Sequence, residues 1–282
     1  MNDPLDPSLG RDQVASGGSA FRQRSVPILM YHQITPDPDV RFRKYAMTPG
    51  RFALQMRWLA VTGHRTISID DLLAHRRGEL PLPARPVLLT FDDGFQDTHD
   101  HAIPILHRHG FTAVFYLVTG LVGQHSRWLE EERGVSLPLH DWSAARRIEE
   151  LGFRCGSHSV SHPRLAEVGP SRLANELEES RAMLEDELGR PVLDLAYPHG
   201  SYDERVIEAA RTAGYRTACS VRIGSSRPAD DVMALHRIPI GGHESFPTFL
   251  WRLRTGRSPR EWLRRRTTAT RRGAGVTPGG GA

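Results

Sequence analysis

Short apolar runs alternate with longer amphipathic segments along the middle of the chain, and this alternation restricts the fold more than any other feature. The run TAVFYLV at 112–118 is almost entirely apolar, as expected of a parallel strand that is covered on both faces. Strands are predicted at 26–31, 65–69, 86–91, 112–118, 153–157, 192–197, 216–220 and 234–240. Helices are predicted at 48–63, 102–110, 143–152, 171–189 and 203–214. Strands and helices in this order indicate a parallel sheet or barrel.

The length of 282 residues is sufficient for one α/β barrel domain. A hydrophobic content of 39% and a charged content of 25% are typical of a globular protein that folds in water. We therefore predict an α/β fold with mainly parallel strands. In a barrel of this kind, functional side chains gather at the carboxyl ends of the strands. The residues that directly follow each predicted strand are the first candidates for a site.

Composition divides the chain into three parts. Residues 1–24 are rich in Pro, Gly, Ser and Asp without periodicity, and we predict a mobile arm there. Residues 25–255 carry the alternating elements and form the predicted folded domain. Residues 256–282 form a basic tail whose last residues are predicted to be disordered. Nine arginines and one glutamate lie between Arg252 and Arg272, so the formal net charge of +4 originates at this end of the chain.

The arginine-rich end of the chain interleaves apolar side chains with arginines, at Trp251, Leu253, Trp262 and Leu263. This pattern suits an anionic membrane surface or nucleic acid, but its commonest cause is a helix that packs its apolar face on the domain. We predict no nucleic-acid partner, because the tail alone would support one. Peripheral membrane contact through the tail stays open, and so does the oligomeric state.

The chain carries no recognisable signal for export or membrane insertion. Its first residues are polar and include an acid, whereas a signal peptide needs a basic region and an apolar core. No stretch is long and apolar enough to span a membrane. The two cysteines are too few for a disulfide framework. We therefore expect a cytoplasmic protein, with membrane association through the tail and an unusual export route as alternatives.

Acids and histidines follow two of the predicted strands. Asp92 and Asp93 end one apolar strand, and His158 and His162 lie in the loop after a later one. Because parallel strands of a barrel end at one face, these four side chains should converge. Two neutral imidazoles and one carboxylate make a three-ligand divalent metal site with a position open to water. Either aspartate could be the ligand, which would leave the other free as a base.

Each of these patterns is weak by itself. An Asp pair at a turn is most often solvated or caps a helix. Two histidines four residues apart in a loop are often a coincidence, especially in a chain with 14 histidines. The histidines of the segment DTHDH at 97–101 are interpreted as the polar start of a helix. The occurrence of the Asp pair and the His pair in this order is what favours a site.

The two patterns together resemble the polysaccharide deacetylase family, the NodB-homology domain of carbohydrate esterase family 4. TFDDGF resembles its first motif, HSVSHP its second and AYPHG its third. VPILMYH resembles the opening of the branch that acts on exopolysaccharides, and the whole resemblance covers roughly residues 25–245. It implies a distorted (β/α) barrel of the NodB-homology type. It also implies a metal-dependent hydrolase that removes N-acetyl groups from amino sugars of a polysaccharide or glycan intermediate and releases acetate.

The resemblance implies roles for the residues of the first two motifs. Asp93, His158 and His162 would hold a divalent metal. Zn²⁺ is expected first, with Co²⁺, Ni²⁺ or Fe²⁺ as alternatives. Asp92 would be the general base that takes a proton from the water attacking the acetamide carbonyl.

The resemblance also suggests residues for the oxyanion and the leaving amine. In the YPHG turn, the backbone N–H of His199 would donate to the oxyanion, and Tyr197 is a substrate-binding candidate. The leaving amine needs a general acid. His32 matches the histidine of the exopolysaccharide branch, whereas His236 lies nearer the late histidine of other branches. We prefer His32 and keep His236 as the alternative.

Two further positions are candidates. Many family members begin the third motif with an arginine that orients the base, but this chain has Ala196 there. We hypothesise that Arg237, from a neighbouring strand, replaces it. Trp142 and Trp128 lie on or beside the segment before the second motif, where they would either stack on a sugar or anchor the loop.

Two other functions are compatible with the pattern. One is hydrolysis of another non-peptide C–N bond, such as that of a small or cyclic amide, on the same scaffold. The other is a catalytically silent glycan-binding module. A glycan requires an open groove and a small amide a closed pocket. The presence of Asp92 counts against a silent module, which would not need a free base.

Overall fold

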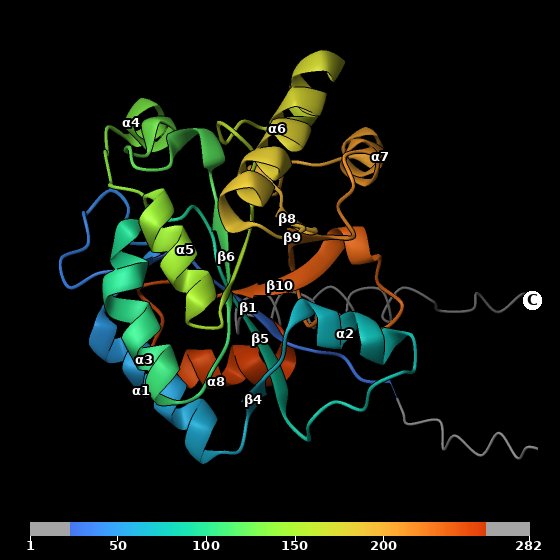
Figure 1. Ribbon diagram of the computed structural model, residues 1–282. Coiled ribbons are helices and arrows are strands. Elements are labelled where there is room, and N and C mark those ends of the chain that lie inside the picture. Colours follow the sequence, from blue (N-terminus) through green and yellow to red (C-terminus); the bar gives the residue numbers. More distant parts are fainter. Residues whose placement is uncertain (1–22, 258–282) are drawn as a thin grey trace, which may run out of the picture.

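The computed structural model describes residues 23–257 (Figure 1). Most of the predicted N-terminal arm and nearly all of the predicted basic tail lie outside the described residues, so both stay predictions. Gln23 and Arg24, which the sequence placed in the arm, bond to the domain. The Gln23 amide donates to the carbonyl of Arg76, and the Arg24 guanidinium to that of Ala84.

Within residues 23–257, seven strands form a closed barrel in which all neighbouring pairs are parallel. Around the ring they are β1 (Ile28–Tyr31), β5 (Pro86–Phe91), β6 (Val114–Leu117), β7 (Arg154–Ser157), β8 (Asp194–Ala196), β9 (Thr217–Ile223) and β10 (Leu235–Pro239). The ring closes because β1 pairs with both β5 and β10. The predicted α/β barrel with parallel strands is confirmed.

The barrel is irregular where β4 (Arg65–Thr66) pairs with the start of β5. The sequence predicted a strand at 65–69, and its second half is wrong. Ser68 instead caps α2 (Ile69–Arg76), because its side chain accepts from the backbone of Asp71 while the Asp71 carboxylate accepts from the backbone of Ser68. A separate parallel pair joins β2 (Gln33–Ile34) and β3 (Ala46–Met47).

The helices surround the barrel (Figure 1). Besides α2, the longer ones are α1 (Pro49–Val61), α3 (Ile103–Arg108), α4 (Arg127–Arg133), α5 (Trp142–Glu150), α6 (Pro170–Leu188), α7 (Glu204–Thr212) and α8 (Phe246–Thr255). A short π-helix precedes α3 at Thr98–Ala102, and single 3-10 turns lie at Thr119–Leu121, Leu165–Glu167, Pro198–Gly200 and Val232–Ala234. None of the described helices combines the length and the apolar character that crossing a membrane requires.

The largest apolar core lies between the strands and helices α1, α3, α5 and α8. Phe91 of β5 is stacked against Phe115 of β6, with ring centroids 4.8 Å apart, and against Tyr31 of β1 at 5.4 Å. Burial of each such ring contributes about 1.5–3 kcal/mol to folding. This packing fixes the end of β5, which is the strand that leads into Asp92.

Helix α8 contains the first apolar residues of the arginine-rich end of the chain. Leu253 is buried and Trp251 is half-buried, so this part of the segment packs on the barrel as a helix. Trp262 and Leu263 lie outside the described residues, and membrane contact through them remains a prediction.

Candidate functional site

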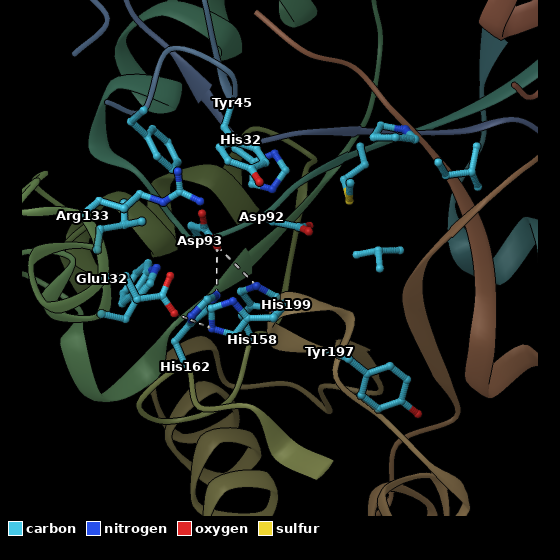
Figure 2. A pocket seen from close by; sticks show the side chains of 17 residues that line it. His32, Tyr45, Asp92, Asp93, Glu132, Arg133, His158, His162, Tyr197 and His199 are labelled. Carbon is cyan, nitrogen blue, oxygen red and sulfur yellow. Dashed lines mark ion pairs between the residues drawn. The ribbon is translucent and has the colours of Figure 1, made fainter. Parts of the chain in front are cut away.

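Two strand ends bring Asp93, His158 and His162 together, as the sequence predicted. Asp93 lies two residues after β5, and both histidines lie in the loop that follows β7. The Nε2 atoms of His158 and His162 are each 3.3 Å from Oδ1 of Asp93 (Figure 2). All three side chains are buried, and their ligand atoms lie within 4.8 Å of one another. Within residues 23–257 this is the one group of three or more such side chains arranged to hold a metal ion.

The backbone around this cluster is strained. Four non-glycine residues of the described chain have a positive φ, and all belong to the motifs at this site. They are Asp93 at 76°, Ser159 at 64°, His162 at 61° and His199 at 57°. Such conformations are unfavourable for residues with a Cβ and persist where the surrounding structure imposes them, often at functional sites. Two of these four residues, Asp93 and His162, belong to the cluster itself.

Helix α6 holds the histidine loop in this shape through the buried carboxylate of Glu176. Its Oε2 accepts from the backbone N–H groups of Val160 and Ser161, at 3.0 and 2.8 Å, and its Oε1 accepts from the Ser161 hydroxyl. The Ser159 hydroxyl also accepts from the backbone of His162. The loop lies between the two histidines, so Glu176 determines their relative position.

Both histidines present their Nε2 atoms to the cluster. The Nδ1–H of His158 donates to the carbonyl of Ala196 at 2.7 Å, which fixes the ring with its Nε2 toward Asp93. Burial lowers the pKa of His162 to about 4, although the neighbouring Asp93 opposes this shift. The ring of His162 stacks on that of Trp128, with centroids 4.4 Å apart. Neutral imidazoles are the protonation state that metal binding requires.

Asp92 faces the interior of the barrel, where its carboxylate forms an ion pair with Arg237 of β10. The two guanidinium nitrogens donate to the two carboxylate oxygens of Asp92 at 2.6 and 2.7 Å. The same guanidinium donates to the carbonyl of Ser220 at 2.9 Å and to the hydroxyl of Thr90 at 3.2 Å. Arg237 is fully buried and Asp92 is 3% exposed. The hypothesis that Arg237 orients Asp92 requires a contact between the two side chains, and the structure contains it.

Both carboxylates stay ionised despite their burial. Burial raises the pKa of Asp92, but Arg237 and His158 outweigh it and the pKa lies below its ordinary value. Burial likewise raises the pKa of Asp93, but hydrogen bonds from His158 and His162 hold it well below the ordinary value. The adjacent acids avoid mutual repulsion because each has its own cationic or hydrogen-bonding partner.

A pocket of about 280 Å³ opens over the cluster at the carboxyl ends of the strands. His32, Tyr197 and His199 line it together with both aspartates and both histidines of the cluster (Figure 2). His32 follows β1, its Nδ1 is buried without a hydrogen-bond partner, and its ring lies 5.1 Å from that of Tyr45. Burial lowers the pKa of His32, while Asp93 and Asp92 raise it. His32 is thus in reach of a ligand in the pocket.

Other predicted residues lie at the edge of the pocket or outside its lining. His236 is absent from the lining, and its Nδ1 lies 3.5 Å from Oδ2 of Asp230. The Tyr197 hydroxyl points away and donates to the carbonyl of Met233. Trp142 begins α5 and packs against the core, outside the pocket lining. His199 has its Nε2 3.7 Å from Oε1 of Glu132.

Sequence reasoning missed α4 and the role of Glu176. Helix α4 supplies Trp128, Glu132 and Arg133 to the pocket, but it is only seven residues long and gives little periodic signal. Glu176 had a readable signal, because it lies among the leucines of the buried stripe of α6. A carboxylate at a core position of an amphipathic helix needs a partner inside the protein.

Comparisons with known proteins agree with this architecture. The family model described as polysaccharide deacetylase matches residues 79–218. The "putative polysaccharide deacetylase YxkH" of Bacillus subtilis is 26% identical over 215 residues, which cover 76% of this chain and 71% of that protein. The poly-beta-1,6-N-acetyl-D-glucosamine N-deacetylase of Staphylococcus epidermidis is 21% identical over 256 residues, 82% of this chain and 83% of that one.

Two solved structures have a similar fold. The Streptococcus pyogenes deacetylase PplD, in complex with acetate, superposes with a TM-score of 0.69 at 24% identity, covering 82% of this chain and 98% of that one. IcaB from Ammonifex degensii superposes with a TM-score of 0.68 at 24% identity, covering 81% and 95%. At this identity the two structures establish the shared barrel fold.

Proposed function

Because the chain belongs to the polysaccharide deacetylase family, we propose that it removes N-acetyl groups from amino sugars of a glycan in a metal-dependent reaction that releases acetate. The proposal rests on one observation, which is that a three-residue cluster and a separate ionised carboxylate lie in the same pocket. Asp93 converges with two histidines, while the neighbouring Asp92 is held ionised by Arg237. The name of the staphylococcal relative supports the N-acetylated glycan as the substrate class.

The three converging side chains fit a divalent metal. Two imidazole nitrogens and one carboxylate oxygen are a donor set used by Zn²⁺, and also by Co²⁺, Ni²⁺ and Fe²⁺. Asp93, His158 and His162 would hold the ion, and the bond from His158 to the Ala196 carbonyl fixes its ligand nitrogen. When bound, such an ion lowers the pKa of water to about 7 and polarises the carbonyl that is attacked.

The residues of the chain would perform the proton transfers. Asp92 takes a proton from the water that attacks the acetamide carbon, and Arg237 holds the carboxylate in place for it. The backbone N–H of His199 donates to the carbonyl oxygen as negative charge develops there. The C–N bond then breaks, the amine leaves with a proton from a general acid, and acetate is released.

His32 is the better candidate for that acid, because it lines the pocket whereas His236 does not. Replacing His32 by glutamine is expected to lower kcat by about 10²-fold, the lower end for general acid catalysis. It should also flatten the alkaline limb of the pH–rate profile, where the acid loses its proton. The matched His236→Gln variant should stay within about twofold of wild type. A larger loss in His236→Gln than in His32→Gln would reverse the assignment.

Acetate release from N-acetylglucosamine oligomers tests the proposed function. Purified protein, stripped of metal and then supplied with Zn²⁺ or Co²⁺, is expected to release acetate only after metal addition. One ion should bind per chain. Metal binding without acetate release would reject this substrate and favour hydrolysis of a small or cyclic amide. Glycan binding without either metal or hydrolysis would favour a silent binding module.

A further inference from the structure

A buried contact joins the segment that carries His32 to the segment that carries the two adjacent aspartates. Gln33 begins β2 directly after His32, and Asp97 lies just before the π-helix that follows the aspartates. The side-chain Nε2 of Gln33 donates to Oδ2 of Asp97 at 2.6 Å. Gln33 is 4% exposed, so this bond lies inside the protein. It links the chain at the candidate general acid to the chain at the candidate base.

The position of His32 depends on the backbone on either side of it. Its Nδ1 is buried, and no side chain or backbone group of residues 23–257 bonds to that atom. Before His32, the carbonyl of Tyr31 accepts from the backbone N–H of Asp92 at 3.0 Å. After His32, the side chain of Gln33 bonds to Asp97. Loss of the second bond would therefore free one of the two ends that hold the histidine.

Two buried oxygens of the Gln33–Asp97 contact have no hydrogen-bond partner among the described residues. They are Oε1 of Gln33 and Oδ1 of Asp97, the remaining oxygens of the two groups that the 2.6 Å bond joins. If Asp97 is ionised, both oxygens can only accept, and a buried acceptor without a donor is unfavourable. A protonated Asp97 supplies the donor, because its O–H can donate to Oε1 while its other oxygen accepts from Nε2.

The surroundings of Asp97 favour the protonated form. Burial raises its pKa to about 7, and the charge of Asp100 adds to the rise, while hydrogen bonds from Gln33 and the Ile34 backbone oppose it. Among residues 23–257, no basic side chain forms an ion pair with Asp97, and His99 pairs with Asp100 instead. The basic side chains of the two helices that pack on the π-helix are exposed, at Arg51 and Arg57 of α1 and at His107 and Arg108 of α3.

We propose that Asp97 keeps a proton near neutral pH and shares it with Gln33, and that this acid–amide pair positions His32 for proton transfer. The part that concerns His32 rests on the proposed function. Neither Gln33 nor Asp97 lines the pocket, so both act through His32 as positioning residues. When Asp97 ionises, the O–H donor is replaced by a second acceptor, and the link between β2 and the π-helix weakens.

The kinetic test compares Asp97→Asn with the wild type across pH. Asparagine mimics the protonated acid at every pH, since its Nδ2 can donate to Oε1 of Gln33 and its Oδ1 can accept from Nε2. The kcat of the variant divided by that of the wild type should rise about threefold between about pH 6 and 8.5, with a midpoint near pH 7. Taking this ratio cancels the titration of groups that both proteins share, including His32.

Two further variants complete the kinetic test. Asp97→Ala breaks the pair at every pH. It should lower kcat about tenfold with KM unchanged, within the loss of about 10²-fold that a displaced catalytic group can cause. Rescue of kcat by Asp97→Asn would show that the bonds to Gln33 are what matters. The matched control is Asp37→Asn, the same chemical change at an exposed position in the loop after β2, and its kcat ratio should stay constant with pH.

Thermal stability tests the shared proton without a substrate. The ordinary pKa of an aspartate is 3.8, whereas folded Asp97 keeps its proton up to about pH 7. Between these values the unfolded chain has lost the proton that the folded chain retains, so the wild type loses stability as the pH rises and levels off above pH 7. Asp97→Asn has no such loss. Its Tm relative to the wild type should increase by about 2–4 °C between pH 5 and 8, whereas that of Asp37→Asn should not.

The two measurements separate the parts of the proposal. A Tm difference that stays constant with pH would refute the shared proton. A Tm difference that increases while the kcat ratio stays constant would refute the positioning of His32. Because the Tm comparison needs no substrate, it decides on the pair even if no oligomer releases acetate. Failure of the proposed function is recognised separately, by the missing acetate in the wild type.

Discussion

Replacing Asp92 by asparagine is expected to lower kcat for acetate release by about 10²–10⁴-fold, the usual contribution of a general base. The amide has nearly the shape of the carboxylate but cannot accept the proton of the attacking water. Metal content should stay at one ion per chain, because the three proposed ligands are unchanged. The measurements are kcat on an N-acetylated oligomer, bound metal by elemental analysis, and Tm to show that the variant is folded.

The neighbouring residue supplies the matched control. Asp93→Asn makes the same chemical change one position later, but Oδ1 of Asp93 is the atom 3.3 Å from both histidine Nε2 atoms. This variant should lose metal and, as a consequence, activity. The two variants are thus expected to separate metal binding from proton transfer. Metal loss in Asp92→Asn with metal retained in Asp93→Asn would show that the two roles are exchanged.

The geometry explains why two adjacent carboxylates can have different roles. Asp93 has a φ of 76°, and the following Gly94 has a φ of 74°, so the chain turns sharply after β5. One carboxylate then points into the barrel toward Arg237, and the other toward the two histidines. Arg237 lowers the pKa of Asp92, and the hydrogen bonds from the two histidines lower the pKa of Asp93. Sequence reasoning found the pair but could not decide, without the family resemblance, which aspartate was the ligand.

Features with a local cause were predictable from the sequence. The barrel follows from the alternation of apolar runs and amphipathic helices, and its strand ends carry Asp93, His158 and His162 to one face. The first half of the strand predicted at 65–69 is present. The Ile and Thr residues of this segment favoured a strand throughout, so the prediction overlooked that Ser68 caps helix α2. There a short-range hydrogen bond outweighs the preference of β-branched residues for strands.

Features that depend on packing between distant segments were not predictable in the same way. Trp128 reaches the pocket because α4 folds over the histidine loop, and its ring stacks on His162. Trp142, an equal candidate in the sequence, instead packs on the core at the start of α5. Both are tryptophans on the segment before the second motif. Only the tertiary structure distinguishes the residue that faces the site from the one that anchors a helix.

Arg237→Ala is expected to change both stability and the pH dependence of turnover. Removing one partner of a buried ion pair costs about 3–5 kcal/mol, because the remaining charge is left without compensation. In the wild type, the lowered pKa of Asp92 stabilises the fold above the ordinary pKa of an aspartate, and this stabilisation is lost as the pH falls. In the variant, burial would raise that pKa without opposition from Arg237.

The catalytic consequence is a shift of the acid limb of kcat to higher pH, since Asp92 must be ionised to act as a base. Turnover at neutral pH should fall while the metal stays bound, because Arg237 contacts Asp92, Ser220 and Thr90 and none of the proposed ligands. The measurements are kcat against pH, metal content and chemical denaturation. An unchanged acid limb with unchanged kcat would refute a role for Arg237 in holding the base.

A double variant distinguishes the loss of the ion pair from the loss of packing. Asp92→Asn combined with Arg237→Met removes both charges and keeps most of the buried volume, so it should be more stable than Arg237→Ala alone. It should be no more active than Asp92→Asn, because the base is already absent. If the double variant is as unstable as Arg237→Ala, the arginine stabilises the barrel mainly through its bonds to Ser220 and Thr90. The position of the acid limb in Arg237→Ala then remains the deciding measurement, because those two bonds leave the protonation of Asp92 unchanged.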